Sequence, residues 1–94
     1  MSLYEGMFII DGKIADDDVQ KAISQIEEQI SSNNGKVIEN KSIGRRQLAY
    51  EIKGCTEGTY VLIDFELNGV ALKPIQEKLK LDQEILRSLI LKKK

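Results

Sequence analysis

The chain of 94 residues contains no histidine and no tryptophan, and it has only one cysteine and one proline. Without an imidazole it can build neither a Ser-His-Asp triad nor a metal site with histidine ligands. The single thiol, Cys55, can form neither an intrachain disulfide nor a zinc site, and it is a poor nucleophile without a histidine. These absences argue against an enzyme, so we predict no catalytic residue, no metal and no cofactor.

An excess of one charge and a long apolar run are also missing. The 14 basic residues face 15 acidic ones, whereas nucleic-acid binders usually carry a basic surplus. No apolar run approaches the roughly 20 residues that cross a bilayer, and the first residues do not resemble a signal peptide. We expect one soluble, cytoplasmic domain over residues 1–94, with no membrane partner and no small-molecule substrate.

The chain does contain alternating strand and helix patterns. Four segments are rich in aromatic and β-branched residues and predict strands: 3–11, 36–53, 59–67 and 84–92. Two segments with apolar residues at three- and four-residue spacing predict helices: 16–32 and 70–81. We expect a hairpin loop at 54–58, a bulge near Gly44 and Pro74 in the first turn of its helix. The run from Asp16 to Asp18 is interpreted as helix capping rather than as a magnesium site.

This order of elements, β-α-β-β-α-β, predicts the α+β fold class. The expected form is a ferredoxin-like sandwich, in which a four-stranded antiparallel sheet carries two helices on one face. Right-handed crossovers place the first and third strands in the centre of the sheet. The second sheet face then has no helix over it and should be lined by polar residues.

Two strands depart from that expectation because both of their faces are apolar. On the fourth strand we group Ile85 with Leu89 and Leu91, opposite Leu86 and Ile90. The apolar surface expected on the uncovered face is formed by Met7, Ile9, Leu62, Leu89 and Leu91. A contiguous apolar patch indicates a surface for a partner protein. The alternative is a set of scattered surface residues without function.

Positive charge clusters locally although the total is balanced. Four candidates for RNA contacts are Arg45, Arg46, Lys53 and Arg87, followed by the lysines at 92–94. Tyr50 and Tyr60 lie among them and can stack on bases, as aromatic residues do on other RNA-binding sheets. The alternative is an ordinary solvated surface with tyrosines that pack in the core.

Four segments carry a resemblance to a known family. They are Tyr4-Glu5, Gly44-Arg45-Arg46-Gln47-Leu48-Ala49-Tyr50, Gly58-Thr59-Tyr60-Val61-Leu62 and Leu81-Asp82-Gln83-Glu84-Ile85-Leu86-Arg87. In order and spacing they resemble the bacterial small-subunit ribosomal protein six family (protein S-six) over essentially the whole chain. The resemblance implies a ferredoxin-like fold without enzymatic activity. It also implies binding to the central domain of small-subunit ribosomal RNA, together with small-subunit ribosomal protein eighteen.

Several positions depart from the family pattern. Ser2 and Leu3 stand where members often have arginine, Glu51 stands where proline is frequent, and many members continue into a longer polar tail. From the residues alone, two other functions remain open. One is a ferredoxin-like protein-interaction module that binds no RNA. The other is a small enzyme of the acylphosphatase kind, although the segment 11–13 offers no arginine for an anion-binding loop.

Overall fold

The computed structural model describes residues 1–93, without the side chain of Asp16. Lys94, which we grouped with the C-terminal lysines, lies outside the described residues. The elements are β1 (Ser2–Asp11), α1 (Asp16–Ser32), β2 (Lys36–Ile52), β3 (Cys55–Leu67), a 3-10 turn (Gly69–Ala71), α2 (Leu72–Leu81) and β4 (Ile85–Lys92). The predicted order β-α-β-β-α-β is confirmed.

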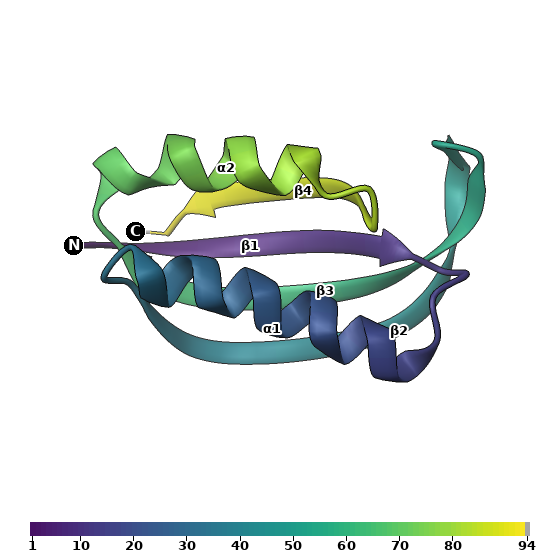
Figure 1. The fold of residues 1–94 in the computed structure, drawn as a ribbon, viewed down its shortest axis with the longest axis horizontal. Coiled ribbons are helices and arrows are strands. Elements are labelled where there is room, and N and C mark those ends of the chain that lie inside the picture. Colours follow the sequence, from purple (N-terminus) through teal and green to yellow (C-terminus); the bar gives the residue numbers. More distant parts are fainter. Residues whose placement is uncertain (94) are drawn as a thin grey trace.

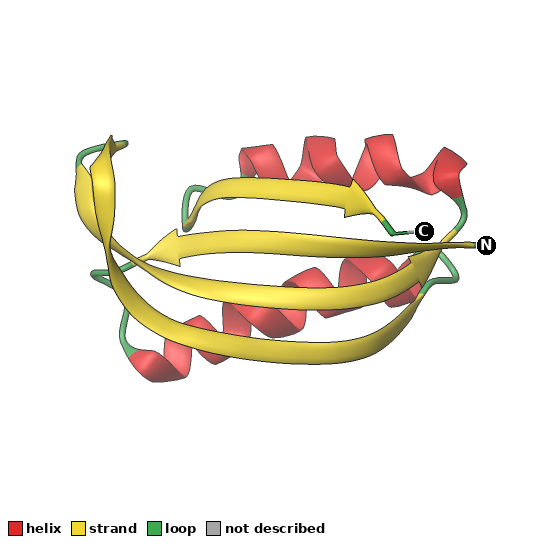
Figure 2. Cartoon of the chain, turned by 180° about the vertical axis from the view of Figure 1, so that it is seen from behind, coloured by secondary structure: helices red, strands yellow, loops and turns green. Residues whose placement is uncertain are grey.

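The four strands form one antiparallel sheet in the order β2-β3-β1-β4. Both helices lie on the same side of this sheet (Figure 1). Seen from behind, the sheet has no helix in front of it (Figure 2). The predicted ferredoxin-like sandwich is therefore confirmed, and so are the central positions of β1 and β3. We call the side without helices the open face.

The main core lies between the sheet and the two helices. Alternate residues of the central strands point into it, including Phe8 and Ile10 from β1 and Ile63 and Phe65 from β3. The apolar stripe of α1 packs against them through Val19, Ala22, Ile23, Ile26 and Ile30. Burial of each large apolar side chain contributes about 1.5–3 kcal/mol, so this layer holds most of the fold's stability.

The helix ends follow the sequence signals with one exception. Asn34 has a φ of 64° and the Gly35 N–H donates to the Ile30 carbonyl, which ends α1 as expected. Pro74 is the third residue of α2, in the first turn, where its missing N–H removes no helical hydrogen bond. The expected side-chain cap of α1 was wrong. The N-cap residue is Ala15, without a side-chain hydrogen bond, because the chain enters the helix before the aspartates.

The predicted loop at 54–58 was also wrong. A two-residue turn, Lys53-Gly54, joins β2 to β3, and Ile52 pairs directly with Cys55. Both turn residues have positive φ, 48° and 78°, which is the type I′ geometry that matches the twist of a hairpin. The hairpin therefore continues past the end of β1, where Asp11 pairs with Gly58. We call residues 47–57 the arm, and it curls toward the side of β4 (Figures 1 and 2).

Two of the register shifts in the sheet decide which side chains reach the open face. The predicted bulge near Gly44 is confirmed by a register shift after Ser42 and by a φ of 102° at the glycine. A second shift lies between β1 and β4, where Ile9 pairs with Arg87 and Ile10 pairs with Ile85. Leu86 is the extra residue, so Ile85 faces the helices. Grouping Ile85 with Leu89 was therefore wrong.

Candidate functional site

The arm divides the open face into two unequal environments. At its own end of the sheet, four apolar side chains bury one another on the open side. These are Ile9, Leu48, Cys55 and Leu86, each at most 8% exposed, with Ile52 and Tyr60 packed against them. We call this region the closed half. It is a second small core, which the alternation pattern alone did not predict.

Gly58 allows the arm to approach β1 closely. A Cβ atom at this position would lie 2.5 Å from Ile9 Cγ2 and 3.4 Å from Leu48 Cδ2. The first distance is far below van der Waals contact, so any side chain here would push the arm away from β1. The glycine is therefore a packing requirement of the closed half.

The tip region of the arm reaches the opposite edge of the sheet. Arg87 of β4 donates a hydrogen bond from Nη1 to Tyr50 Oη at 2.7 Å, and its Cζ lies 5.6 Å from the centre of the Tyr50 ring. This brings two predicted RNA-binding residues together. Tyr50 remains 59% exposed, so much of its ring is still open to a ligand.

The other predicted RNA-binding residues are distributed around the arm. Arg45 and Arg46 alternate on β2, and the Arg45 guanidinium lies 3.5 Å from the Ile14 carbonyl on the helix side. Arg46 shares the side of Leu48, and Lys53 lies in the turn. Tyr60 is half-buried under the arm, which limits its use for stacking. Among the side chains that the structure describes, no ion pair involves the four predicted RNA-binding cations Arg45, Arg46, Lys53 and Arg87.

The rest of the open face, away from the arm, is uncovered. Leu62, Met7 and Leu89 are neighbours across three strands, and Leu91 lies opposite Glu5. Met7 and Leu62 are half-buried, whereas Leu89 and Leu91 are 47% and 55% exposed. We call these four apolar residues and their surroundings the bare half. Ile9, predicted to belong to the same surface, is only 5% exposed because the arm covers it.

Carboxylates adjoin the bare half, and sequence reasoning did not single them out. Glu5, Glu39 and Asp64 line a small pocket together with Lys41 and Leu62. Lys93 Nζ lies 3.0 Å from Asp64 Oδ2 and 3.9 Å from Glu5 Oε2. The hydrogen bond to Asp64 raises the pKa of Lys93. The available signal was the alternation of β3, which places Asp64 and Glu66 beside Leu62 on the open face.

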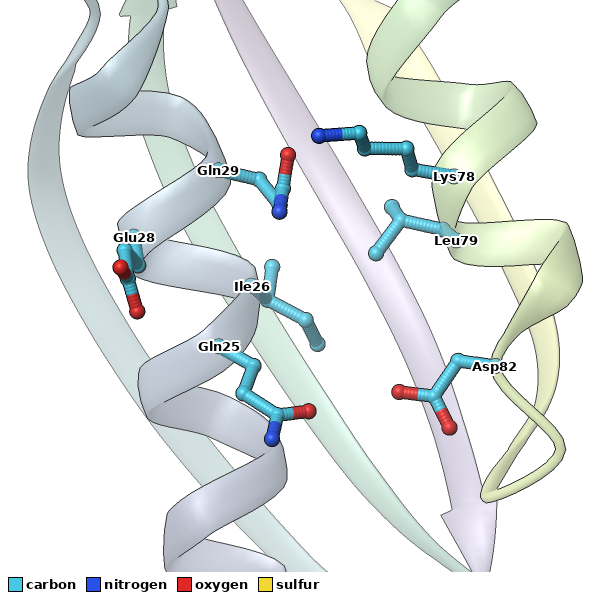
Figure 3. Close-up of a pocket in the computed structure, with 7 residues that line it drawn as sticks. All are labelled: Gln25, Ile26, Glu28, Gln29, Lys78, Leu79 and Asp82. Atoms are coloured by element: carbon cyan, nitrogen blue, oxygen red, sulfur yellow. The ribbon is translucent and has the colours of Figure 1, made fainter.

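A cleft of about 180 Å³ separates the two helices on the other face (Figure 3). Lys78 and Asp82 extend from the α2 side toward Gln29 and Gln25 of α1, above Ile26 and Leu79. None of the predicted site residues lies in it. Within the described residues, no three cysteine, aspartate or glutamate side chains are grouped as metal ligands.

Cys55 is not activated for chemistry. Its burial raises the pKa of the thiol, and the nearby Asp11 carboxylate raises it further. The thiol is therefore protonated at neutral pH and is a poor nucleophile. None of the helices in residues 1–93 is both long and apolar enough to span a bilayer.

A four-stranded antiparallel sheet with two helices on one face defines the class of ferredoxin-like domains. The sequence profile described as ribosomal protein S6 matches residues 3–92, and the chain belongs to this family. The resemblance drawn from the four sequence segments is confirmed.

Individual relatives agree with this assignment. The small ribosomal subunit protein bS6 of Protochlamydia amoebophila is 34% identical over 97% of the chain and 80% of its own length. The protein of the same name from Rickettsia felis is 32% identical, covering 98% and 76%. That of Koribacter versatilis is 31% identical over 89% of the chain, which spans only 57% of that longer protein.

Solved structures show the same fold. The crystal structure of 30S ribosomal protein S6 from Thermotoga maritima superposes with a TM-score of 0.92 at 28% identity, covering 98% of this chain and 87% of that one. The C-terminal domain of the MgtC protein from Mycobacterium tuberculosis has a TM-score of 0.61 at 16% identity, covering 99% and 88%, and shares the fold alone.

Family membership settles two of the open questions. The family consists of non-enzymatic structural proteins, so the expectation that the chain is not an enzyme is confirmed. The acylphosphatase alternative is thereby excluded. Membership also places the chain among the proteins of the small ribosomal subunit.

Proposed function

We propose that this chain binds the central domain of small-subunit ribosomal RNA jointly with small-subunit ribosomal protein eighteen. One observation carries the proposal. Tyr50 and Lys53 of the arm, together with Arg46 and Arg87 next to it, lie beside an uncovered apolar surface on the open face of the sheet. The arm offers groups that bind phosphates and bases, and the apolar surface offers a protein contact.

In this proposal the RNA contacts lie on the arm and on the parts of β2 and β4 next to it. Arg46, Lys53 and Arg87 neutralise phosphates, and the exposed ring of Tyr50 stacks on a base. Arg45 contacts the backbone from the helix side of β2, because its side chain lies near Ile14. The half-buried Tyr60 packs under the arm and supports its position.

The protein contact is assigned to the bare half. Met7, Leu62, Leu89 and Leu91 form its apolar part, whereas Ile9 is covered by the arm. A basic partner also accounts for RNA binding by a chain of near-zero net charge, because the partner can supply much of the phosphate neutralisation.

A salt series tests the RNA contacts. We expect Arg46→Ala with Lys53→Ala to weaken binding of the protein-eighteen complex to a central-domain RNA fragment. The slope of log affinity against log salt should fall by about 0.7–0.9 for each phosphate that the variant no longer neutralises. A matched control, Lys73→Ala with Lys80→Ala on α2, removes the same charge from the helix layer. Equal slopes for the wild type and the arm variant would remove both residues from the RNA site.

The remaining rival is an interaction module that binds no RNA. Co-sedimentation with 30S particles, with and without nuclease treatment, separates the two. We expect the chain to sediment with intact particles and to be released when the RNA is digested. If the chain stays bound to a protein after the RNA is digested, and binds no purified RNA, the rival is favoured.

A further inference from the structure

The carboxylates beside the bare half have no role in the function proposed so far. Glu5 and Asp64 are direct neighbours on β1 and β3, and Glu39 pairs with Asp64 from β2. Leu91 lies on the other side of Glu5, across β4. A row of three acidic side chains therefore runs up to the exposed apolar surface, and Glu39 at the far end of this row pairs with Lys41 at 3.7 Å.

This combination restricts what can cover the bare half. Leu89 and Leu91 need an apolar contact, since about half of each remains exposed. The adjoining carboxylates repel the phosphates of RNA and attract positive charge. The occupant that satisfies both requirements is a protein segment with apolar and basic side chains.

Lys93 shows how a cation fits between these groups. Its ammonium lies 3.0 Å from Asp64 Oδ2 and 3.9 Å from Glu5 Oε2, and its side chain is still 38% exposed. An ion pair open to water contributes little stability, so another cation can replace it at low cost. An arginine fits two neighbouring carboxylates especially well, because its guanidinium can bond both at once.

We propose that a basic segment of the protein partner docks on the bare half, where one of its arginine or lysine side chains takes the position that Lys93 holds in the free chain. This inference rests on the proposed partnership with protein eighteen. It assigns the two halves to different ligands, with RNA at the arm and a basic protein segment at the bare half.

Charge reversal tests the recognition. Glu5→Lys with Glu39→Lys changes the formal net charge from −1 to +3, because each substitution adds two units. Glu28→Lys with Glu77→Lys makes the same change on exposed positions of the two helices. We call these variants the open-face pair and the helix pair. Calorimetric titration with purified protein eighteen, free of RNA, should show that the open-face pair binds about tenfold more weakly than wild type. The affinity of the helix pair should stay within about twofold of wild type. Equal effects of the two pairs would overturn the inference.

Removal of Lys93 tests the exchange. Lys93→Ala frees the carboxylates for the partner, so we expect binding a few-fold tighter than wild type. Unchanged or weaker binding would overturn the exchange. If the variant Glu5→Lys with Glu39→Lys fails to fold, as judged by circular dichroism, Glu5→Gln with Glu39→Gln replaces it, because glutamine keeps the size of the side chains. That pair should weaken binding about threefold, and wild-type affinity would again contradict the inference.

The outcomes also separate this inference from the proposed function. A wild-type chain that does not bind protein eighteen at all would contradict the partnership itself. A wild-type chain that binds, while the open-face and helix pairs bind equally well, would contradict only the docking of a basic segment.

Discussion

Two residues on one strand show how differently the halves of the open face are built. Met7 and Ile9 lie two positions apart on β1 and point to the same side of the sheet. Met7 is half-buried in the bare half, whereas Ile9 is 5% exposed under the arm. The alternation of a strand thus decides which face a side chain joins, while a distant hairpin decides whether that face is covered.

The largest expected effect contrasts the stability of the two halves. Ile9→Ala removes a side chain packed against Leu48, Cys55 and Leu86, and should lower the free energy of unfolding by about 2–4 kcal/mol. Leu89→Ala removes a half-exposed side chain and should cost less than about 1 kcal/mol. Urea unfolding measures both. Similar losses would mean that the two halves are packed alike.

The second effect concerns binding to the partner protein, for which the bare half should matter more than it does for stability. Leu89→Ser with Leu91→Ser should leave the fold intact and weaken binding to protein eighteen by about tenfold, which is about 1.4 kcal/mol. The matched control is Val70→Ser with Leu81→Ser, at exposed positions in the helix layer. Calorimetric titration of both variants would reveal the difference. If the control pair weakens binding as much, the bare half is not the protein contact.

A smaller effect concerns the contact between the arm and β4. Tyr50→Phe removes the hydrogen bond to Arg87 but keeps the ring, so stability should fall by no more than about 1 kcal/mol. Tyr50→Ala also removes the stacking surface, and should weaken RNA binding by about 1–3 kcal/mol. Thermal unfolding and a gel-shift titration give the two values. RNA affinity that is unaffected by Tyr50→Ala would remove the ring from the RNA site.

The smallest effect is the pH dependence that Cys55 gives to the closed half. Burial raises the pKa of the thiol above its usual value of 9.0, so the folded state keeps the proton longer than the unfolded state. This contribution is complete below pH 9.0, and it is lost as the pH rises through the pKa of the folded protein. Urea unfolding between neutral and alkaline pH should show a decline in the wild type that Cys55→Ala lacks. Identical profiles would mean that the thiol is accessible to water.

Local signals in the sequence predicted much of the fold. The apolar spacing predicted a helix at 16–32, and the observed helix α1 has the same bounds, Asp16–Ser32. The arm was missed because the composition of 54–58 suggests a loop, whereas only Lys53 and Gly54 need positive φ. The bulge at Leu86 was missed because apolar neighbours on both sides hide a shift of register.

The candidate site was predicted only in part, for a physical reason. Residue types identified Tyr50 and Arg87 individually, but their contact joins positions 37 residues apart, and it depends on the twist of the whole hairpin. The same long-range contact removes Ile9 from the exposed surface. The carboxylates around Lys93 were missed because their sequence pattern carries no special signal. Polar residues are expected on any open sheet face, whether or not it has a function.

The division of one sheet face between protein and RNA can be tested most directly by hydroxyl-radical footprinting of this chain. The measurement compares the free chain, its complex with protein eighteen, and the complex after addition of the central-domain RNA. We predict that protein eighteen alone protects Met7, Leu62, Leu89 and Leu91, and that Tyr50 becomes protected only when RNA is added. Protection of Tyr50 by the protein alone, with Leu89 and Leu91 still reactive, would contradict the account.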